Sequence, residues 1–300
     1  MSDPILIVGT GALACLFAAR LSAIGVEVTL LGTWREGLKA LQKGVRLEEN
    51  GEETIYPVRA TSNPSDCFGM RDALVLVKAW QTERAARQLG MCLAPDGVAL
   101  TLQNGYGNRE ILAKSLGPNN VALGVTTTGA TLTGPGRVRP GGQGTISVES
   151  HPRLGPVISL LRQAGFVVEE TPNADSLVWS KLVINAAINP LTALLRVPNG
   201  ELLERPPARA LMADLAREAA AVAAALNILL TFDDPVAATE SVAQRTSHNH
   251  SSMYQDIERG APSEIDAICG AVVRVGEQLG VPTPVNKVMW GLVQAGAIRR

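Results

Sequence analysis

The sequence lacks any surplus of positive charge. Its 300 residues include 27 lysines and arginines against 28 aspartates and glutamates, so the formal net charge is −1. Proteins that bind nucleic acid hold the phosphate backbone with clustered basic side chains, and this balance disfavours such a function. We therefore expect a small-molecule partner and no nucleic acid.

Closely spaced metal ligands are also scarce. The four cysteines form no C-x-x-C pair, which excludes the usual spacing of zinc and redox motifs, and their mostly apolar or small neighbours fit reduced thiols. These residues are Cys15, Cys67, Cys92 and Cys269. His248 and His250 form an H-x-H pair without a third ligand nearby, so we predict no metal site.

Long apolar runs are missing too. No run reaches the roughly 18 residues that cross a bilayer. The first residues, Met1-Ser2-Asp3-Pro4, lack the basic start of a secretory signal. With 46% hydrophobic and 18% charged residues, the composition is that of a globular protein. We predict a cytoplasmic protein that does not associate with membranes.

A glycine turn follows the first apolar segment. The run Ile5-Leu6-Ile7-Val8 leads into Gly9-Thr10-Gly11-Ala12-Leu13-Ala14, and an apolar helix pattern follows. In a dinucleotide site, the first glycine allows a sharp turn, the second lets a pyrophosphate approach, and a small third residue lets the helix pack closely. The pattern predicts a cofactor site at residues 9–14. The alternative is an ordinary glycine turn in an α/β domain.

Strand-like and helix-like segments alternate through the first half of the chain. Apolar runs predict strands at 26–31, 73–77, 98–102, 121–127 and 167–170, joined by helical crossovers, which is typical of a parallel sheet. Residues 136–142 and 145–148 predict two short antiparallel strands around a glycine turn. Beyond residue 175 only helical patterns occur, including 208–229 and 265–279. We predict an α/β, Rossmann-type doubly wound domain over 1–172 and an all-helical substrate-binding, catalytic domain over 173–300.

The residues after the second strand bear on the choice of cofactor. NAD-binding folds place an acidic residue there for the ribose 2′-hydroxyl, but this chain has Gly32-Thr33-Trp34-Arg35. Thr33 and Arg35 could bind a 2′-phosphate, which favours NADPH. Arg35 could instead be a solvated residue at a helix start. Lys78, after the strand at 73–77, is either a ligand contact or a surface lysine.

A polar stripe interrupts the apolar segment at 179–190. Lys181, Asn185 and Asn189 are spaced by four residues and therefore lie on one side of a helix. An apolar environment lowers the pKa of a lysine, which suits a general acid. Alternatively, Lys181 reaches water while the asparagines bind neighbouring backbone. Glu264 stands at the predicted start of the 265–279 helix, where an acid also offsets the helix dipole.

These motifs together resemble the ketopantoate reductase family over essentially the whole chain. The matching pieces, in order, are Gly9-x-Gly11-Ala12-Leu13-Ala14, Lys78-Ala79-Trp80-Gln81, Gln103-Asn104-Gly105, Trp179-Ser180-Lys181-Leu182 with Asn185, Asn189 and Pro190, Ser251-Ser252-Met253 with Gln255-Asp256, Glu264-Ile265-Asp266, and Val281-Pro282-Thr283-Pro284.

The resemblance implies NADPH-dependent reduction of 2-dehydropantoate to pantoate, in the pathway to pantothenate and coenzyme A. It assigns Lys181 as the general acid and Glu264 as the residue that orients it and helps to hold substrate. The implied substrate-binding residues are Asn104, Asn185, Asn189, Asn249 and Ser252, with Asn104 and Lys78 at the junction of substrate and cofactor.

Two other functions remain open. The first is a related NAD(P)-dependent reductase of another 2-keto or 3-hydroxy acid, because fold and motif do not fix the substrate. The second is a catalytically silent NADP-binding sensor. The sequence also leaves a homodimer open.

Overall fold

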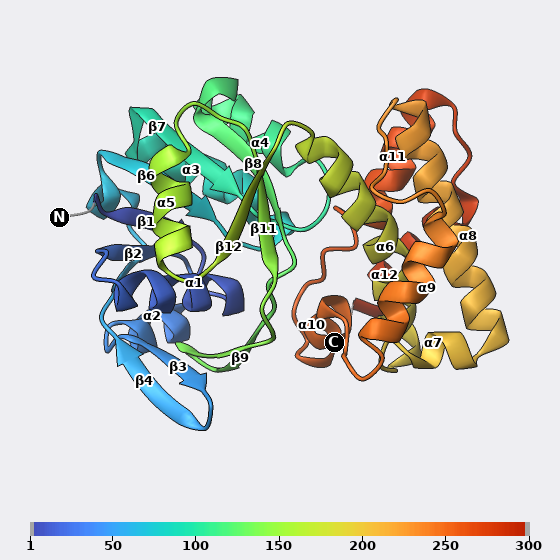
Figure 1. Cartoon of the computed structure of the whole chain (residues 1–300), viewed down its shortest axis with the longest axis horizontal. Helices are drawn as coiled ribbons and strands as arrows, with labels where there is room; N and C mark the ends of the chain where they lie inside the picture. Colours follow the sequence, from blue (N-terminus) through green and yellow to red (C-terminus); the bar gives the residue numbers. More distant parts are fainter. Residues whose placement is uncertain (1–2, 298–300) are drawn as a thin grey trace. The chain divides into compact units, whose positions relative to one another are not determined.

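The computed structural model of the chain describes residues 3–297, which form two compact units (Figure 1). The α/β unit comprises Met1–Gln103 and Asn108–Ala174. The helical unit comprises Asp175–Arg300 together with the short segment Asn104–Gly107. The chain therefore passes into the helical unit briefly before it completes the α/β unit.

An eight-stranded sheet forms the centre of the α/β unit, with the order β12-β11-β8-β7-β6-β1-β2-β5. Neighbouring strands are parallel, except for the antiparallel pair β8 and β11. The strands are β1 (Ile5–Val8), β2 (Val28–Leu31), β5 (Arg59–Thr61), β6 (Met70–Val75), β7 (Leu93–Thr101), β8 (Val121–Thr126), β11 (Thr145–Glu149) and β12 (Val167–Thr171). This arrangement confirms the predicted α/β fold class and the position of 167–170 at the sheet edge.

Helices cover both faces of this sheet. Ile5 and Ile7 of β1 pack into the core that contains α1 and α5, while Leu6 and Val8 pack into the core that contains α3 and α4. Because successive strand residues point to opposite faces, a strand buried on both sides is apolar at every position. The helices are α1 (Ala12–Ala23), α2 (Arg35–Leu41), α3 (Thr82–Cys92), α4 (Asn108–Leu116) and α5 (Gly155–Gln163), with short 3₁₀ turns η1 (Pro64–Cys67), η2 (Ala79–Gln81) and η3 (Pro118–Asn120).

A second, four-stranded sheet of order β4-β3-β10-β9 corrects part of the prediction. Its strands are β3 (Val45–Glu49), β4 (Glu52–Tyr56), β9 (Ala130–Gly134) and β10 (Arg137–Pro140). The predicted pairing of 136–142 with 145–148 is wrong: β10 pairs with β9 and β3, and β11 pairs with β8 and β12. The turn at Gly134-Pro135-Gly136, where Gly136 has φ of +66°, folds β10 back onto β9 instead.

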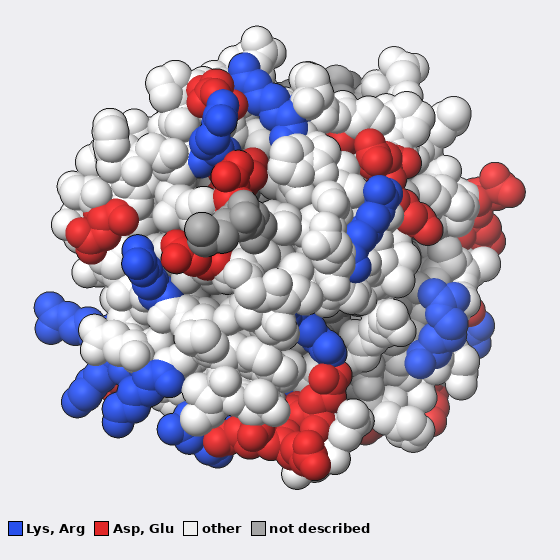
Figure 2. All heavy atoms as spheres, turned by 60° about the vertical axis from the view of Figure 1, so that its left-hand side comes forward, with Lys and Arg blue, Asp and Glu red and all other residues white. Residues whose placement is uncertain are grey.

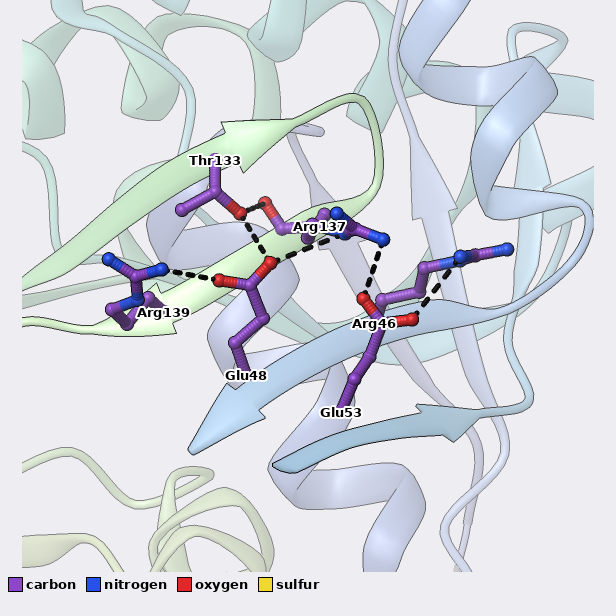
Figure 3. Close-up of polar contacts among 6 residues, drawn as sticks. All are labelled: Arg46, Glu48, Glu53, Thr133, Arg137 and Arg139. Carbon is purple, nitrogen blue, oxygen red and sulfur yellow. Dashed lines mark hydrogen bonds and ion pairs between the residues drawn. The ribbon is translucent and has the colours of Figure 1, made fainter. Parts of the chain in front are cut away.

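Charged side chains lie across one face of this small sheet (Figure 3). Glu48 forms ion pairs with Arg137 at 3.3 Å and with Arg139 at 2.9 Å. Glu53 forms ion pairs with Arg46 at 3.2 Å and with Arg137 at 2.8 Å. These ion pairs join β3, β4 and β10. On the surface that Figure 2 shows, basic and acidic side chains likewise lie in small adjoining groups.

The helical unit has a core of its own. Its helices are α6 (Ala174–Leu195), α7 (Glu201–Glu204), α8 (Pro206–Ala225), α9 (Pro235–Arg245), α10 (Ser252–Glu258), α11 (Cys269–Leu279) and α12 (Pro284–Ala297). Helix α6 is long and apolar enough to cross a membrane, but most of it is buried in the protein, as in the core helix of a globular domain. Trp179, on this helix, is fully buried.

Pro190 lies inside α6 and locally changes its hydrogen bonding. Proline has no N–H, so the carbonyl of Ala186 loses its helical donor. The Cys269 thiol of α11 donates to that carbonyl instead, at 3.7 Å. Contacts from neighbouring elements therefore help to hold this part of α6, which carries the predicted Asn189.

Candidate active site

The glycine turn of the α/β unit has the backbone that a pyrophosphate site requires. Gly9 has φ of +136°, its N–H donates to Leu31 at 2.8 Å, and an added Cβ would lie 3.0 Å from the Leu76 carbonyl oxygen. Only glycine fits there. Gly11 is the N-cap of α1, and an added Cβ would meet no other atom within 4 Å. Open space in front of a helix N-terminus leaves room for an anion.

The segment after β2 begins with Gly32, which lies against the Thr10 side chain. A Cβ on Gly32 would lie 2.7 Å from Cγ2 of Thr10, because this segment crosses directly over the glycine turn. Thr33, Trp34 and Arg35 are exposed, and Arg35 begins α2. These residues can therefore receive a ligand from solvent, and residues 32–35 include no carboxylate.

Lys78 and Gln103 lie just beyond strand ends of the same sheet. Lys78 is partly buried and is the N-cap of η2, after β6. The Gln103 amide donates to the Val77 carbonyl at 3.0 Å and to Thr82 at 2.8 Å, which ties the end of β7 to the end of β6. Ligands bind at the carboxyl ends of strands in open α/β sheets. Gln103 is a supporting residue that the sequence motif contains but that our site prediction did not include.

Lys181 lies on α6 among apolar side chains. It is partly buried, on a helix whose other residues are mostly apolar. Burial lowers the pKa of Lys181 from 10.5 to about 8, and the negative charge of Glu264 partly opposes this effect by raising it. A lysine with this pKa gives up a proton much more readily than an exposed one.

Glu264 does not stand at a helix start as expected. Helix α11 begins only at Cys269, and residues 264–268 form turns in which the Glu264 carbonyl accepts from Ala267 at 3.0 Å and Ile268 at 3.1 Å. The Glu264 side chain is 5% exposed, and Oε2 accepts a hydrogen bond of 3.2 Å from the Asn104 amide. The turn places this carboxylate in the interior of the helical unit, where it acts on the charge of Lys181.

The segment Asn104–Gly107 brings Asn104 to that carboxylate. Gly105 has φ of +88°, and a Cβ there would lie 2.5 Å from the Ala267 carbonyl oxygen. The Tyr106 N–H donates to the same carbonyl at 2.9 Å, and its ring lies 5.1 Å from that of Trp179. Three predicted site residues, Asn104, Lys181 and Glu264, therefore belong to one cluster, although they come from distant parts of the sequence.

The remaining predicted residues lie on α6 and on the segment before α10. Asn185 is partly buried and Asn189 is 7% exposed. Ser252 begins α10, while Asn249 is exposed and its carbonyl accepts from the Asn199 N–H at 3.0 Å. His250 stacks on Tyr254 with ring centroids 4.4 Å apart.

Thr192 was missed by the sequence reasoning, although it continues the polar stripe of Lys181, Asn185 and Asn189 by three more residues. It is fully buried, and its hydroxyl lies 2.7 Å from that of Ser251. The helical spacing of the polar stripe could therefore have predicted that Thr192 lies with these residues.

A surface pocket of about 880 Å³ also lies in the α/β unit, away from all predicted site residues. It lies between α1, the β3–β4 turn and residues 139–144. Its arginines are paired with acids: Arg20 with Glu49 at 2.5 Å and Arg139 with Glu48 at 2.9 Å.

A glycine turn on a Rossmann-type sheet and a partly buried lysine near a buried carboxylate in a helical unit are the parts expected of a nucleotide-dependent reductase. Comparison with known proteins gives the family. The model described as ketopantoate reductase PanE/ApbA matches residues 5–153, and the model of its C-terminal part matches 173–297. The chain belongs to the ketopantoate reductase family.

Individual relatives agree with this. A 2-dehydropantoate 2-reductase of Archaeoglobus fulgidus is 38% identical over 96% of both chains, and one of Halobacterium salinarum is 33% identical over 97% of both. The crystal structure of a PanE/ApbA family ketopantoate reductase from Ralstonia eutropha matches with a TM-score of 0.92, at 34% identity over 98% of both chains. The ternary structure of D-mandelate dehydrogenase with NADH and anilino(oxo)acetate matches with a TM-score of 0.90, at 28% identity over 98% of both.

Proposed function

We propose that this protein is a 2-dehydropantoate 2-reductase, which reduces 2-dehydropantoate to (R)-pantoate with NADPH in the pathway to pantothenate and coenzyme A. The observation that carries the proposal is Lys181, whose pKa is lowered to about 8 beside the buried Glu264. In this proposal residues 1–172 bind the nucleotide, and residues 173–300 bind the substrate and supply the acid.

The chain's own residues fit a dinucleotide. The backbone at Gly9 leaves no room for a Cβ, Gly11 opens the N-terminus of α1, and Thr10 lies against Gly32. We assign the pyrophosphate to residues 9–14, with Lys78 and Asn104 contacting the cofactor further along. When bound, the reduced nicotinamide supplies a hydride to the carbonyl carbon of the keto acid.

Lys181 supplies the proton in this mechanism. Negative charge develops on the carbonyl oxygen as the carbon receives the hydride, and the ammonium of Lys181 both stabilises that charge and donates its proton to it. The product is a hydroxyl group, and the neutral amine regains a proton from water. Glu264 favours the charged form of Lys181, so the acid is mostly protonated at neutral pH.

Amide and hydroxyl groups around the lysine would hold the rest of the substrate. Asn185 and Asn189 lie on α6 with Lys181, while Asn249 and Ser252 lie at the start of α10. Amides and hydroxyls both donate and accept, which suits the carboxylate and the hydroxyl of 2-dehydropantoate. Asn104 would act beside Glu264, with which it already forms a hydrogen bond of 3.2 Å.

The preference for NADPH rests on the segment after β2. The sequence has no acid at residues 32–35, and the exposed Thr33 and Arg35 offer a hydroxyl and a guanidinium for a 2′-phosphate. The cytoplasmic location stays a prediction, as does any homodimer.

A second candidate is a reductase of another 2-keto acid that uses NADH. The structure of D-mandelate dehydrogenase with NADH favours it, since that enzyme is 28% identical with a TM-score of 0.90.

One set of rate measurements tests both candidates. The purified full chain is assayed for oxidation of NADPH and of NADH with 2-dehydropantoate, 2-oxoisovalerate and benzoylformate. We expect the highest kcat/KM with NADPH and 2-dehydropantoate. A higher value with NADH and benzoylformate would establish the second candidate. Cofactor binding without oxidation by any keto acid would instead indicate a silent sensor.

A further inference from the structure

Two buried hydroxyl groups connect the helix of the lysine to the helix that begins with Ser252. Thr192 of α6 is fully buried and Ser251, the N-cap of α10, is 5% exposed. Their hydroxyl oxygens lie 2.7 Å apart. Each of them lies close in sequence to a predicted substrate-binding residue. Thr192 is one helical turn after Asn189, and Ser251 directly precedes Ser252.

The hydroxyl pair is part of a chain of hydrogen bonds in which every group has a partner. The Tyr254 N–H donates to the Ser251 hydroxyl at 3.1 Å. The Thr192 hydroxyl lies 3.0 Å from the carbonyl oxygens of Ile188 and Asn189. The Thr192 hydroxyl donates to the Ser251 oxygen, which also accepts from the Tyr254 N–H, so donors from α6 and α10 meet at one hydroxyl group. The first turn of α10 is thus fixed to the backbone of Asn189.

Hydrogen bonds from Asn199 and Gly200 hold the preceding segment, residues 246–250. Asn199, just beyond α6, donates its N–H to the Asn249 carbonyl at 3.0 Å and its amide to Thr246 at 2.8 Å. The Gly200 N–H donates to the Ser247 carbonyl at 3.1 Å. These bonds fix residues 246–249 to the segment just after α6, whereas the hydroxyl pair fixes the start of α10.

We propose that Thr192 and Ser251 are positioning residues, which hold Ser252 at a fixed distance from Asn185 and Asn189 so that both sides grip one keto acid. This inference rests on the proposed function, because it takes those residues as the substrate contacts. Binding of a small acid by several polar groups depends on their spacing, and a shift of about 1 Å weakens it strongly.

Thr192→Val tests the inference with little risk to the fold. Valine has the shape of threonine, and without Thr192 the Ser251 hydroxyl still accepts from Tyr254 and caps α10. We expect the KM for 2-dehydropantoate to rise about five- to tenfold. The kcat should change less, and the dissociation constant of NADPH should stay the same. Thr192→Ser keeps the hydroxyl and should restore the wild-type KM.

Thr239→Val is the matched control. Thr239 is also fully buried, but its hydroxyl donates to Pro235 within α9 at 2.7 Å. This variant also loses one buried helical hydroxyl and should keep the wild-type KM. Hydrogen exchange of the 246–258 segment, measured in the wild type and all three variants, should accelerate in Thr192→Val alone.

The outcomes separate this inference from the proposed function. If the wild type reduces 2-dehydropantoate and Thr192→Val has the same KM and exchange as Thr239→Val, the positioning role is wrong and the proposed function stands. An equal rise of KM in both valine variants would also overturn it, since a general loss of packing would then be the cause. If the wild type reduces no keto acid of the panel, the proposed function fails, and the role in substrate binding fails with it.

Discussion

The two units bring opposite charges together in very different surroundings. In the four-stranded sheet, Glu48 and Glu53 contact three arginines at the surface, where side-chain exposure ranges from 20% for Glu48 to 64% for Arg139 (Figure 3). In the helical unit, Glu264 is 5% exposed and faces the charge of a partly buried Lys181. The surface cluster has more ion pairs, yet the pair in the helical unit is the one with a large pKa shift.

Desolvation explains the difference. Water screens exposed pairs, so each contributes little to stability. Burial instead penalises the charged form of Lys181 and lowers its pKa to about 8, against the opposing effect of Glu264. A strongly shifted pKa beside a specific partner is a better sign of a functional site than a large number of ion pairs. The following experiments test how far this contrast extends.

The largest effect is expected from Lys181→Ala. If Lys181 is the proton donor, turnover falls about 100- to 10,000-fold, the usual contribution of a general acid. NADPH affinity, measured by fluorescence titration, should stay nearly unchanged because we propose that the glycine turn, and not Lys181, binds the cofactor. Wild-type turnover in this variant would rule out the acid role.

Lys181→Met should remove a pH dependence of stability. The folded pKa of about 8 lies below the ordinary value of 10.5, so between these values the unfolded chain binds more protons. Unfolding free energy contributed by Lys181 therefore rises with pH from about 8 to about 10.5, by up to about 3 kcal/mol. Below this window the lysine is charged in both states and its burial cost is fully present.

Urea unfolding of both proteins at several pH values measures this effect. The difference between Lys181→Met and the wild type should shrink as pH rises through the window. Taking the difference cancels other groups, including Cys269, whose burial raises its pKa and acts in the opposite direction. A difference that stays constant from pH 7 to 10.5 would contradict a lowered pKa.

Glu264→Gln should shift the pH profile of the reaction. Glu264 raises the pKa of Lys181, so its loss lowers that pKa further. Since the acid must be protonated, the alkaline limb of kcat/KM should move to lower pH, with a loss of roughly tenfold at pH 8.5 and less at pH 6.5. Asn104→Ala is a useful comparison, because it removes the hydrogen bond but keeps the carboxylate charge. A loss of kcat/KM without a shift of the alkaline limb would mean that Glu264 contributes only to substrate binding.

The sequence predicted elements that depend on local patterns. The buried strands of the large sheet and the helices predicted at 208–229 and 265–279 follow from apolar runs and helical spacing. The structure confirms these strands and helices but gives the helices the bounds Pro206–Ala225 and Cys269–Leu279. Strands β3 and β4 were missed because charges interrupt them: β3 buries only Val45 and Leu47, and β4 buries none of its residues. Their stability comes from pairing with each other and with β10, which no local pattern reveals.

The same limit applies to the candidate site. The spacing of Lys181, Asn185 and Asn189 was visible, because one helix carries all three. The bond between Asn104 and Glu264 joins residues 160 positions apart. It depends on Gly105 fitting against Ala267, whereas an Asn-Gly pair in the sequence indicates a turn or a ligand contact but not the partner residue.

A smaller effect is expected from Arg35→Ala, which tests whether an exposed charge gains importance when a ligand covers it. Arg35 is exposed at the start of α2. If it binds the 2′-phosphate, the variant should bind NADPH up to about fivefold more weakly, as for an exposed ion pair. NADH lacks that phosphate, so its dissociation constant should not change. Equal weakening of both cofactors would refute the assignment.

The smallest effect is expected from Glu53→Gln in the surface network. It removes the charge that Arg46 and Arg137 share, at 3.2 and 2.8 Å. Because Glu53 is 31% exposed, we expect a loss of at most about 1 kcal/mol in unfolding free energy, which 0.5 M salt should reduce. Glu83→Gln is the matched control, since Glu83 lies 4.0 Å from Arg87 on α3, outside the network. A loss well above 2 kcal/mol for Glu53→Gln alone would mean that these charges organise the small sheet, and exposure would then no longer separate the two clusters.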